Sequence, residues 1–213
     1  MDVRLKFINR SYDGHRREIV LFQKNLAAVE DLVTAWKVIR YCGYEWSHPI
    51  VYPAGLEVAS SDDDGNYSPR IPATHGQMLA VVPNPTGRGR QLAIRGKSTS
   101  PLEIQVLNGL SRGALNFNVF RGGRILSRKS SVAPLQKAVF RFAPVLWIGA
   151  ASQVAQGEEI DAATIGGMNT QLPLPGIASA DIVMSGGGPD PDATAYVFTM
   201  ENIVTVGSQR VRS

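Results

Sequence analysis

The stretch QKAVFRFAPVLWIG, residues 136–149, decides the fold class. In its first half, apolar side chains such as those of Phe140 and Phe142 alternate with more polar ones, which is the period of a strand with one buried and one wet face. Pro144 has no N–H group to donate to a sheet, so it separates this strand from the next one. The residues that follow, around Trp147, are apolar on both faces, as in a strand covered from both sides. The stretch therefore predicts two core strands in which the rings of Phe140, Phe142 and Trp147 are buried.

Runs with the same strand-like character recur outward from this pair in both directions. Gly122 and Gly123 join two of them as a two-residue hairpin turn, which requires positive φ angles. Asn25 predicts the start of a short helix over residues 26–33. The fold class we expect is therefore all-β: an antiparallel β-sandwich of two packed sheets with one short helix near residues 26–33. The expected strands cover residues 3–8, 18–23, 34–40, 55–60, 77–82, 91–95, 102–107, 114–121, 124–128, 137–142, 145–148, 180–184 and 196–206.

The length of the chain, 213 residues, suits one large sandwich or two small ones. We expect a single β-sandwich domain over residues 1–213, and the alternative is a weak two-part organisation, 1–98 and 99–213. The alternative rests on a faint repeat, because an apolar strand that ends at Asn9 is followed by a second apolar strand, and the same order recurs around Asn108. Any sandwich repeats strands and Asn-containing turns, so the repeat leaves both organisations open.

Charge and cysteine content narrow the partners and the compartment. The chain has 22 Lys and Arg residues against 18 Asp and Glu, and this net charge of +4 does not by itself indicate nucleic acid. The aromatic interleaving of a single-strand binder is also missing, so we expect no nucleic-acid partner. Cys42 is the one cysteine, which excludes an intramolecular disulfide. The opening MDVRLKF lacks the apolar stretch of a secretory signal, and no segment reaches the roughly 18 apolar residues of a transmembrane span. We expect a soluble, cytoplasmic protein, with later release from the cell left open.

The sequence offers no recognisable catalytic or cofactor-binding pattern. The histidines His15, His48 and His75 contain no pair with the i, i+4 spacing of a helical metal site, and Cys42 has no CxxC partner. The GxSxG motif of a nucleophile elbow does not occur either. We therefore expect a protein that is not an enzyme and that uses no cofactor.

One candidate site is the aromatic stretch at residues 41–53, which we expect to form a loop. Tyr44, Trp46, His48 and Tyr52 are the candidate ligand-binding residues, because grouped aromatic rings stack on sugars and contact lipid headgroups or cations. The alternative is that the loop folds back and caps the end of the sandwich. The stretch predicts a carbohydrate- or lipid-binding module on the condition that the rings form one exposed patch.

A second candidate is the acidic loop that contains Asp62, Asp63 and Asp64. Calcium binds six to eight oxygen atoms, so three neighbouring carboxylates are candidate metal ligands. The spacing excludes an EF-hand. A solvated turn is the alternative, since Asp, Gly and Asn are the usual turn residues.

The function that the sequence favours is structural, namely self-assembly through subunit–subunit contacts. Charged residues make up 19% of the chain, below the usual quarter, and strands lie near both of its ends. Terminal strands are well placed at sheet edges, where unpaired backbone groups accept a neighbour's strand. We therefore expect a homo-oligomer or a larger assembly. The candidate assembly contacts are Arg121 and Arg124, which face each other across the hairpin turn, and Arg210 and Arg212 in the basic tail, which could meet the acidic loop of a neighbour.

Overall fold

The computed structural model describes residues 1–12, 17–28, 32–84, 86, 89–168, 170–188 and 193–207. Most of these residues lie in β-strands, and one short helix accompanies the strands, so the predicted all-β fold class is confirmed. In chain order the elements are β1 (Val3–Asn9), β2 (Glu18–Phe22), β3 (Val33–Thr34), β4 (Lys37–Ile39), β5 (Ser47–Tyr52), β6 (Leu56–Ser61), β7 (Ile71–Ala73), β8 (Gln77–Pro83), β9 (Arg90–Lys97), β10 (Ile104–Asn108), β11 (Leu115–Arg121), β12 (Arg124–Val132), β13 (Lys137–Phe140), β14 (Val145–Ala151), β15 (Glu159–Ile160), α1 (Ala162–Gly167), β16 (Thr170–Pro173), β17 (Ile177–Gly187) and β18 (Thr194–Thr205).

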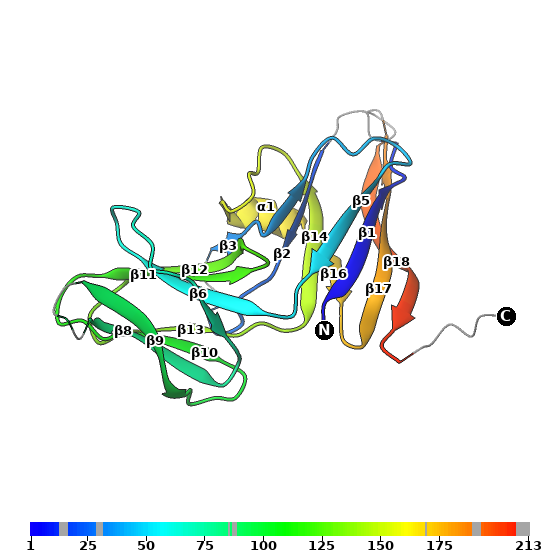
Figure 1. The fold of residues 1–213 in the computed structure, drawn as a ribbon. Coiled ribbons are helices and arrows are strands. Elements are labelled where there is room, and N and C mark those ends of the chain that lie inside the picture. The colour runs from blue at the N-terminus through cyan, green and yellow to red at the C-terminus, as the bar shows by residue number, and fades with distance from the viewer. Residues whose placement is uncertain are drawn as a thin grey trace.

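The larger strands form four-stranded sheets with the orders β18-β17-β1-β5, β16-β14-β2-β4, β13-β10-β8-β9 and β12-β11-β6-β7. The short strands β15 and β3 form a small separate pair. In Figure 1, strands β6 to β13 lie together on one side of the molecule and the other larger strands lie on the opposite side. We call the first two sheets sheet pair I and the last two sheet pair II. Two of these sheets are mixed and not wholly antiparallel, because β1 runs parallel to β17 and β10 runs parallel to β8.

One hydrophobic cluster runs through both sheet pairs and forms the main core. It contains Leu5 and Phe7 from β1 in sheet pair I, and Leu79 from β8 and Phe140 from β13 in sheet pair II. Along β1 the buried side chains alternate with less buried ones, as expected for a strand with one wet face. Because the cluster is continuous, apolar packing joins the two sheet pairs in addition to the chain connections.

Trp147 departs from the prediction that its ring is buried. Phe140 is fully buried and Phe142 nearly so, as predicted, but Trp147 is only half-buried. The alternation of β14 turns the flanking residues such as Ile148 into the main core and turns Trp147 toward the opposite face. There its ring stacks on that of Phe22, with centroids 6.2 Å apart, in a second and smaller apolar cluster that the α1 region helps to cover.

The position predicted for the helix, residues 26–33, is wrong. The Asn25 side chain accepts the N–H of Ala27 at 3.2 Å, as a helix cap would, but it also accepts the N–H of Arg141 at 2.9 Å and donates to the carbonyl of Val139 at 2.9 Å. These bonds tie the segment to β13, and the described residues that follow form a turn and then β3. Helix α1 lies instead in a stretch for which the sequence predicted no structure, with an aspartate capping its first turn.

Two predictions about the chain termini and the aromatic stretch also need correction. Residues 41–53 are not a loop throughout, because β5 begins at Ser47 and pairs with β1. Pro49 obscured this strand in the sequence, but β5 is an edge strand, where a proline is tolerated. β1 was expected at a sheet edge and is instead internal, between β17 and β5.

Candidate functional site

Strand β18 forms one edge of sheet pair I and runs along the outside of the molecule (Figure 1). It is 12 residues long, and among the described residues its ladder partner is β17 alone. Phe198 turns into the core, whereas Val197 and Ile203 are each 50% exposed. Over residues 197–203, β18 therefore combines apolar side chains at the surface with a backbone edge that has no second strand partner among the described residues.

The composition of β18 differs from that of the other edge strands in the described four-stranded sheets. Natural edges resist pairing with other chains by being short, by carrying Pro or charged residues (Lys above all), or by bulging. β5, β7 and β16 contain Pro, and β4, β9, β12 and β13 contain Lys or Arg. β18 contains none of these residues, and Glu201 is its single charged side chain. It is thus the edge that lacks the usual chemical protection.

The ladder between β18 and β17 determines which part of this edge is regular. Register shifts interrupt the ladder toward both ends, and Asn202 has a positive φ of 50°. Between these irregularities the pairing is continuous over residues 197–201 of β18. Because bulges hinder the addition of a further strand, residues 197–201 are the part of the edge that can accept one.

Ion pairs connect β18 to the loops beside it. Arg10 Nε lies 3.4 Å from a carboxylate oxygen of Glu45, and Arg10 Nη1 lies 3.8 Å from one of Glu201. All three side chains are about half exposed, so each pair contributes less than about 1 kcal/mol to stability. Through Arg10, these ion pairs link Glu201 of β18 to Glu45, so the edge lies beside the loop that carries Glu45.

Exposed aromatic side chains gather on that loop and its neighbour. Two of the candidate residues, Tyr44 and Trp46, are exposed, Trp46 by 67%. Tyr12 stacks on Tyr44, with ring centroids 5.9 Å apart, and Tyr41 is also exposed. We call Tyr12, Tyr41, Tyr44 and Trp46 the aromatic end. Tyr12 could not be assigned to this surface from the sequence, because it follows β1 and only the pairing of β1 with β5 brings the two loops together.

The other two candidate residues of the aromatic stretch, His48 and Tyr52, do not belong to this surface. Both lie on β5, which leads away from the loop. His48 is half-buried, and its pKa is lowered by burial first and then by the charges of Lys37 and Arg124. Tyr52 is buried, its ring meets that of Trp36 edge to face at 5.8 Å, and burial raises its pKa. Tyr52 is therefore a core residue, and the predicted aromatic set is not one patch.

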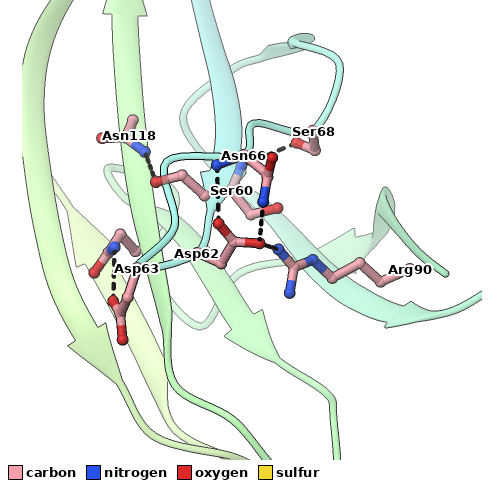
Figure 2. A network of polar contacts seen from close by, with 9 residues as sticks. Ser60, Asp62, Asp63, Asn66, Ser68, Arg90 and Asn118 are labelled. Carbon is pink, nitrogen blue, oxygen red and sulfur yellow. Dashed lines mark hydrogen bonds and ion pairs between the residues drawn. The ribbon is translucent and has the colours of Figure 1, made fainter.

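The acidic loop folds as a turn tied to β9. Figure 2 shows Asp62 accepting the backbone N–H of Asn66, at 2.8 Å, and pairing with Arg90 Nη2 at 2.7 Å. The bond from the Asn66 backbone is the main cause that lowers the pKa of Asp62. Asp63 points a different way, toward a β11 asparagine 3.4 Å away, and Asp64 is exposed. Among the described residues, no group of three His, Cys, Asp or Glu side chains could hold a metal ion.

The arginines named as assembly contacts have different environments. Arg121 and Arg124 do face each other in the β11–β12 hairpin. Arg121 is only 4% exposed, however: its Nη1 donates to two backbone carbonyls, its guanidinium lies 4.3 Å from the centroid of the Tyr52 ring, and burial lowers its pKa. Arg121 is therefore a core group, and this environment does not support its predicted role as an assembly contact. Arg124 is half-buried, and Arg210 and Arg212 lie outside the described residues.

No protein-family model matches this chain, and no curated protein or solved structure is similar enough to count as a match. Over the part of the chain that the structure describes, no helix has the length and apolar character needed to cross a bilayer. The two candidate functional surfaces are therefore the β18 edge and the aromatic end.

Proposed function

We propose that this protein is a non-enzymatic, self-assembling structural protein that acts through subunit–subunit contacts made by β18. The observation that carries the proposal is that β18, alone among the edges of the described four-stranded sheets, lacks Pro, Lys and Arg. Every other edge of those sheets contains at least one residue that opposes strand addition. A long edge without these residues is suited to pairing with another chain.

The partner that fits this edge best is the same strand of a second copy. Two β18 strands that run antiparallel are related by a twofold axis, which makes the contact self-complementary and closed. Pairing over residues 197–201 centres the contact on Thr199 and places Val197 of one copy opposite Glu201 of the other. Thr–Thr pairs are favourable across antiparallel strands, and this register keeps the two Glu201 carboxylates apart. The two outer sheets then become one continuous sheet.

Lysine substitutions at two comparable edges test the proposal. Val197→Lys places a cation on β18, and Ile94→Lys does the same on β9, where Ile94 is 51% exposed and the strand already carries cations. We expect light scattering to find a dimer of the wild type and of Ile94→Lys. In Val197→Lys the dissociation constant should rise by about tenfold or more, which corresponds to about 1.4 kcal/mol. A wild type that is monomeric at high concentration, or equal effects of the two variants, would contradict the proposal.

A second function, binding of a carbohydrate or a lipid headgroup, is supported by the stack of Tyr12 on Tyr44 and by the exposed Trp46. Stacked and exposed rings offer apolar faces with polar rims, the surface that sugars and headgroups contact. A glycan array tests the sugar, and sedimentation with phosphatidylcholine or phosphatidylserine vesicles tests the lipid. Binding that Trp46→Ala abolishes and that Tyr67→Ala, an exposed tyrosine elsewhere, leaves intact supports this function. Absence of binding in both assays excludes it.

A further inference from the structure

Sheet pairs I and II share one pairing pattern. In β18-β17-β1-β5 the successive strand pairs are antiparallel, parallel and antiparallel. In β9-β8-β10-β13 they are again antiparallel, parallel and antiparallel. The remaining sheets, β16-β14-β2-β4 and β7-β6-β11-β12, are antiparallel throughout. Each strand of these sheets in sheet pair I therefore has a counterpart in sheet pair II.

The counterparts follow one another in the chain in a repeating order. β1, β2, β4 and β5 correspond to β10, β11, β12 and β13, and β6, β7, β8 and β9 correspond to β14, β16, β17 and β18. The chain thus runs through the same series of strands twice, and the second series begins after β9. The first four strands of each series pair with the last four of the other, so both halves of the chain contribute to each sheet pair (Figure 1).

Two asparagines show that the correspondence extends to individual hydrogen bonds. Asn9 ends β1 and Asn108 ends β10, the first strand of each series. Each Oδ1 accepts the backbone N–H two residues further on, at 2.9 Å and 3.2 Å respectively. Each Nδ2 also donates to a backbone carbonyl at the end of the counterpart strands β4 and β12. Asn9 binds the carbonyl of Cys42, just after β4, at 2.6 Å, and Asn108 binds that of Val132, the last residue of β12, at 2.9 Å.

Unusual backbone conformations recur at the same places. Tyr41 and Ser131 have φ angles of 56° and 54°, and Glu45 and Leu135 have φ angles of 59° and 63°. Positive φ is uncommon for residues other than glycine, so two matched pairs are a specific signature. The N–H of Glu45 and that of Leu135 each donate to the carbonyl of the asparagine that ends the first strand, both at 2.7 Å.

The two series also cross between the sheet pairs in the same way. Gln23 follows β2, and its Nε2 donates to the carbonyls on either side of Pro144, at 2.8 and 3.0 Å. Arg121 ends β11, the counterpart of β2, and its Nη1 donates to the carbonyls of Pro53 and Ala54. These carbonyls belong to the segments by which each half passes from one sheet pair to the other.

We infer that residues 1–98 and 99–207 are equivalent halves that have exchanged four strands each, so that the protein has the architecture of a strand-exchanged dimer within one chain. Each half supplies four strands to sheet pair I and four strands to sheet pair II. The apolar faces of these strands are covered only when the strands of the other half pack against them. The partner that fits this interaction surface is the opposite half, from the same chain or from a second copy of it. The inference does not rest on the β18 contact, because it concerns the interface inside the fold.

The connection between the halves decides which copy supplies the partner. β8 lies between β9 and β10 in the sheet, so residues 98–103 must cross two strand spacings, about 10 Å. The loop is held against the β7–β8 turn, since the N–H of Ser98 donates to the carbonyl of Gly76 and the N–H of Gly76 donates to the carbonyl of Glu103, both at 2.8 Å. Deletion of residues 98–102 leaves two Cα–Cα steps, about 8 Å, which is too short to cross β8 within one molecule.

The test is this deletion in the full-length chain, made in the Val197→Lys background to weaken the β18 contact and measured at a concentration at which the undeleted Val197→Lys protein is monomeric. We expect light scattering to find twice the monomer mass and circular dichroism to match that of the parent. An insertion of five Gly and Ser residues at the same point is the matched control and should remain monomeric. A deletion variant that folds as a monomer overturns the inference.

A second experiment decides the matter if the deletion variant does not fold. A protease site is inserted after Thr99 in the full-length Val197→Lys chain, and the purified protein is cleaved. The two pieces should co-elute in size exclusion and, after separation in urea, should recombine in a 1:1 ratio with recovery of the parent spectrum. Pieces that part without denaturant, or that each fold alone as a monomer, overturn the inference.

Discussion

At the scale of single residues, two side chains connect the halves most directly, because they bind the segments by which the chain crosses from one sheet pair to the other. We call these segments, at Pro53–Ala54 and around Pro144, the crossings. Arg121 donates to the carbonyls of Pro53 and Ala54, lies on the Tyr52 ring, and is buried with no partner for its Nε among the described residues. Gln23 binds the other crossing in the same way, but as a neutral group. Burying a charge is costly unless strong hydrogen bonds compensate for the lost water. Arg121 therefore serves to hold a crossing together.

Alanine substitutions at the two crossings should differ in cost. Arg121→Ala removes hydrogen bonds from a charged group together with the packing of its stem, so we expect the free energy of unfolding to fall by about 3 kcal/mol. Gln23→Ala removes neutral hydrogen bonds and should cost about 1 kcal/mol. Urea unfolding measures both values. Equal losses would show that the charge of Arg121 plays no part in the crossing.

Two histidines make stability depend on pH. Burial first, and then the charges of Lys37 and Arg124, lower the pKa of His48, while burial and then Arg121 lower the pKa of His75. A lowered pKa in the folded state means that the unfolded chain binds protons more readily, so stability is lost as the pH falls below about 6.5 and is unaffected above it.

The variant His48→Gln/His75→Gln should therefore lose less stability than the wild type between about pH 7 and pH 5. Urea unfolding at a series of pH values gives the two slopes. The same slope in both proteins would mean that neither histidine has a lowered pKa when folded.

At the scale of elements, local patterns predicted strands and turns well, but they predicted strand partners only for the β11–β12 hairpin. Phe140 alternates with polar residues as its strand requires, and Gly122 and Gly123 have the predicted positive φ angles, 56° and 76°. β5 was missed because Pro49 interrupts its pattern, and the helix was misplaced because the bonds of Asn25 go to β13, far along the chain. Nothing local in β1 indicates that it runs parallel to β17. The place of Tyr12 in the aromatic end was missed for the same reason, because it depends on the pairing of β1 with β5, two strands that are distant in the sequence.

Truncations in β13 and β14 test the assignment of their faces. Phe140 is fully buried, so Phe140→Ala should cost about 3–5 kcal/mol of unfolding free energy. Trp147 keeps part of its ring in water, so we expect Trp147→Ala to cost clearly less, about half as much. Urea unfolding of both variants is the measurement. A larger loss for Trp147→Ala would place this ring, and not that of Phe140, at the centre of the core.

At the scale of the whole molecule, the two halves have the same topology but different edges. β9 is the counterpart of β18, and it carries Arg90, Arg95 and Lys97 where β18 has no cation. Charged residues keep an edge from pairing with another strand. Of the two equivalent edges, β9 is therefore protected against strand addition and β18 is open to it. A molecule with one open edge forms a twofold dimer and stops there, whereas two open edges would allow chains of molecules.

Removing cations from β9 should therefore change the size of the assembly. Arg90 is kept because it pairs with Asp62. We expect the double variant Arg95→Thr/Lys97→Thr to form species larger than the dimer in light scattering at high concentration. The same double variant with Val197→Lys should stop at the dimer, because only the β9 edge is then open. A double variant with the wild-type mass would indicate that β9 stays unpaired for reasons other than its charge.

Amide hydrogen exchange of residues 197–201 over a range of protein concentrations tests most directly whether β18 is the subunit contact. In a monomer, the N–H groups of this segment that face away from β17 are unpaired and exchange fast, while those that face β17 are protected. The β18 contact predicts that the outward N–H groups become protected as the concentration rises, while the outward N–H groups of β9 do not change. Fast exchange of the outward β18 N–H groups at concentrations where light scattering finds a dimer would contradict it.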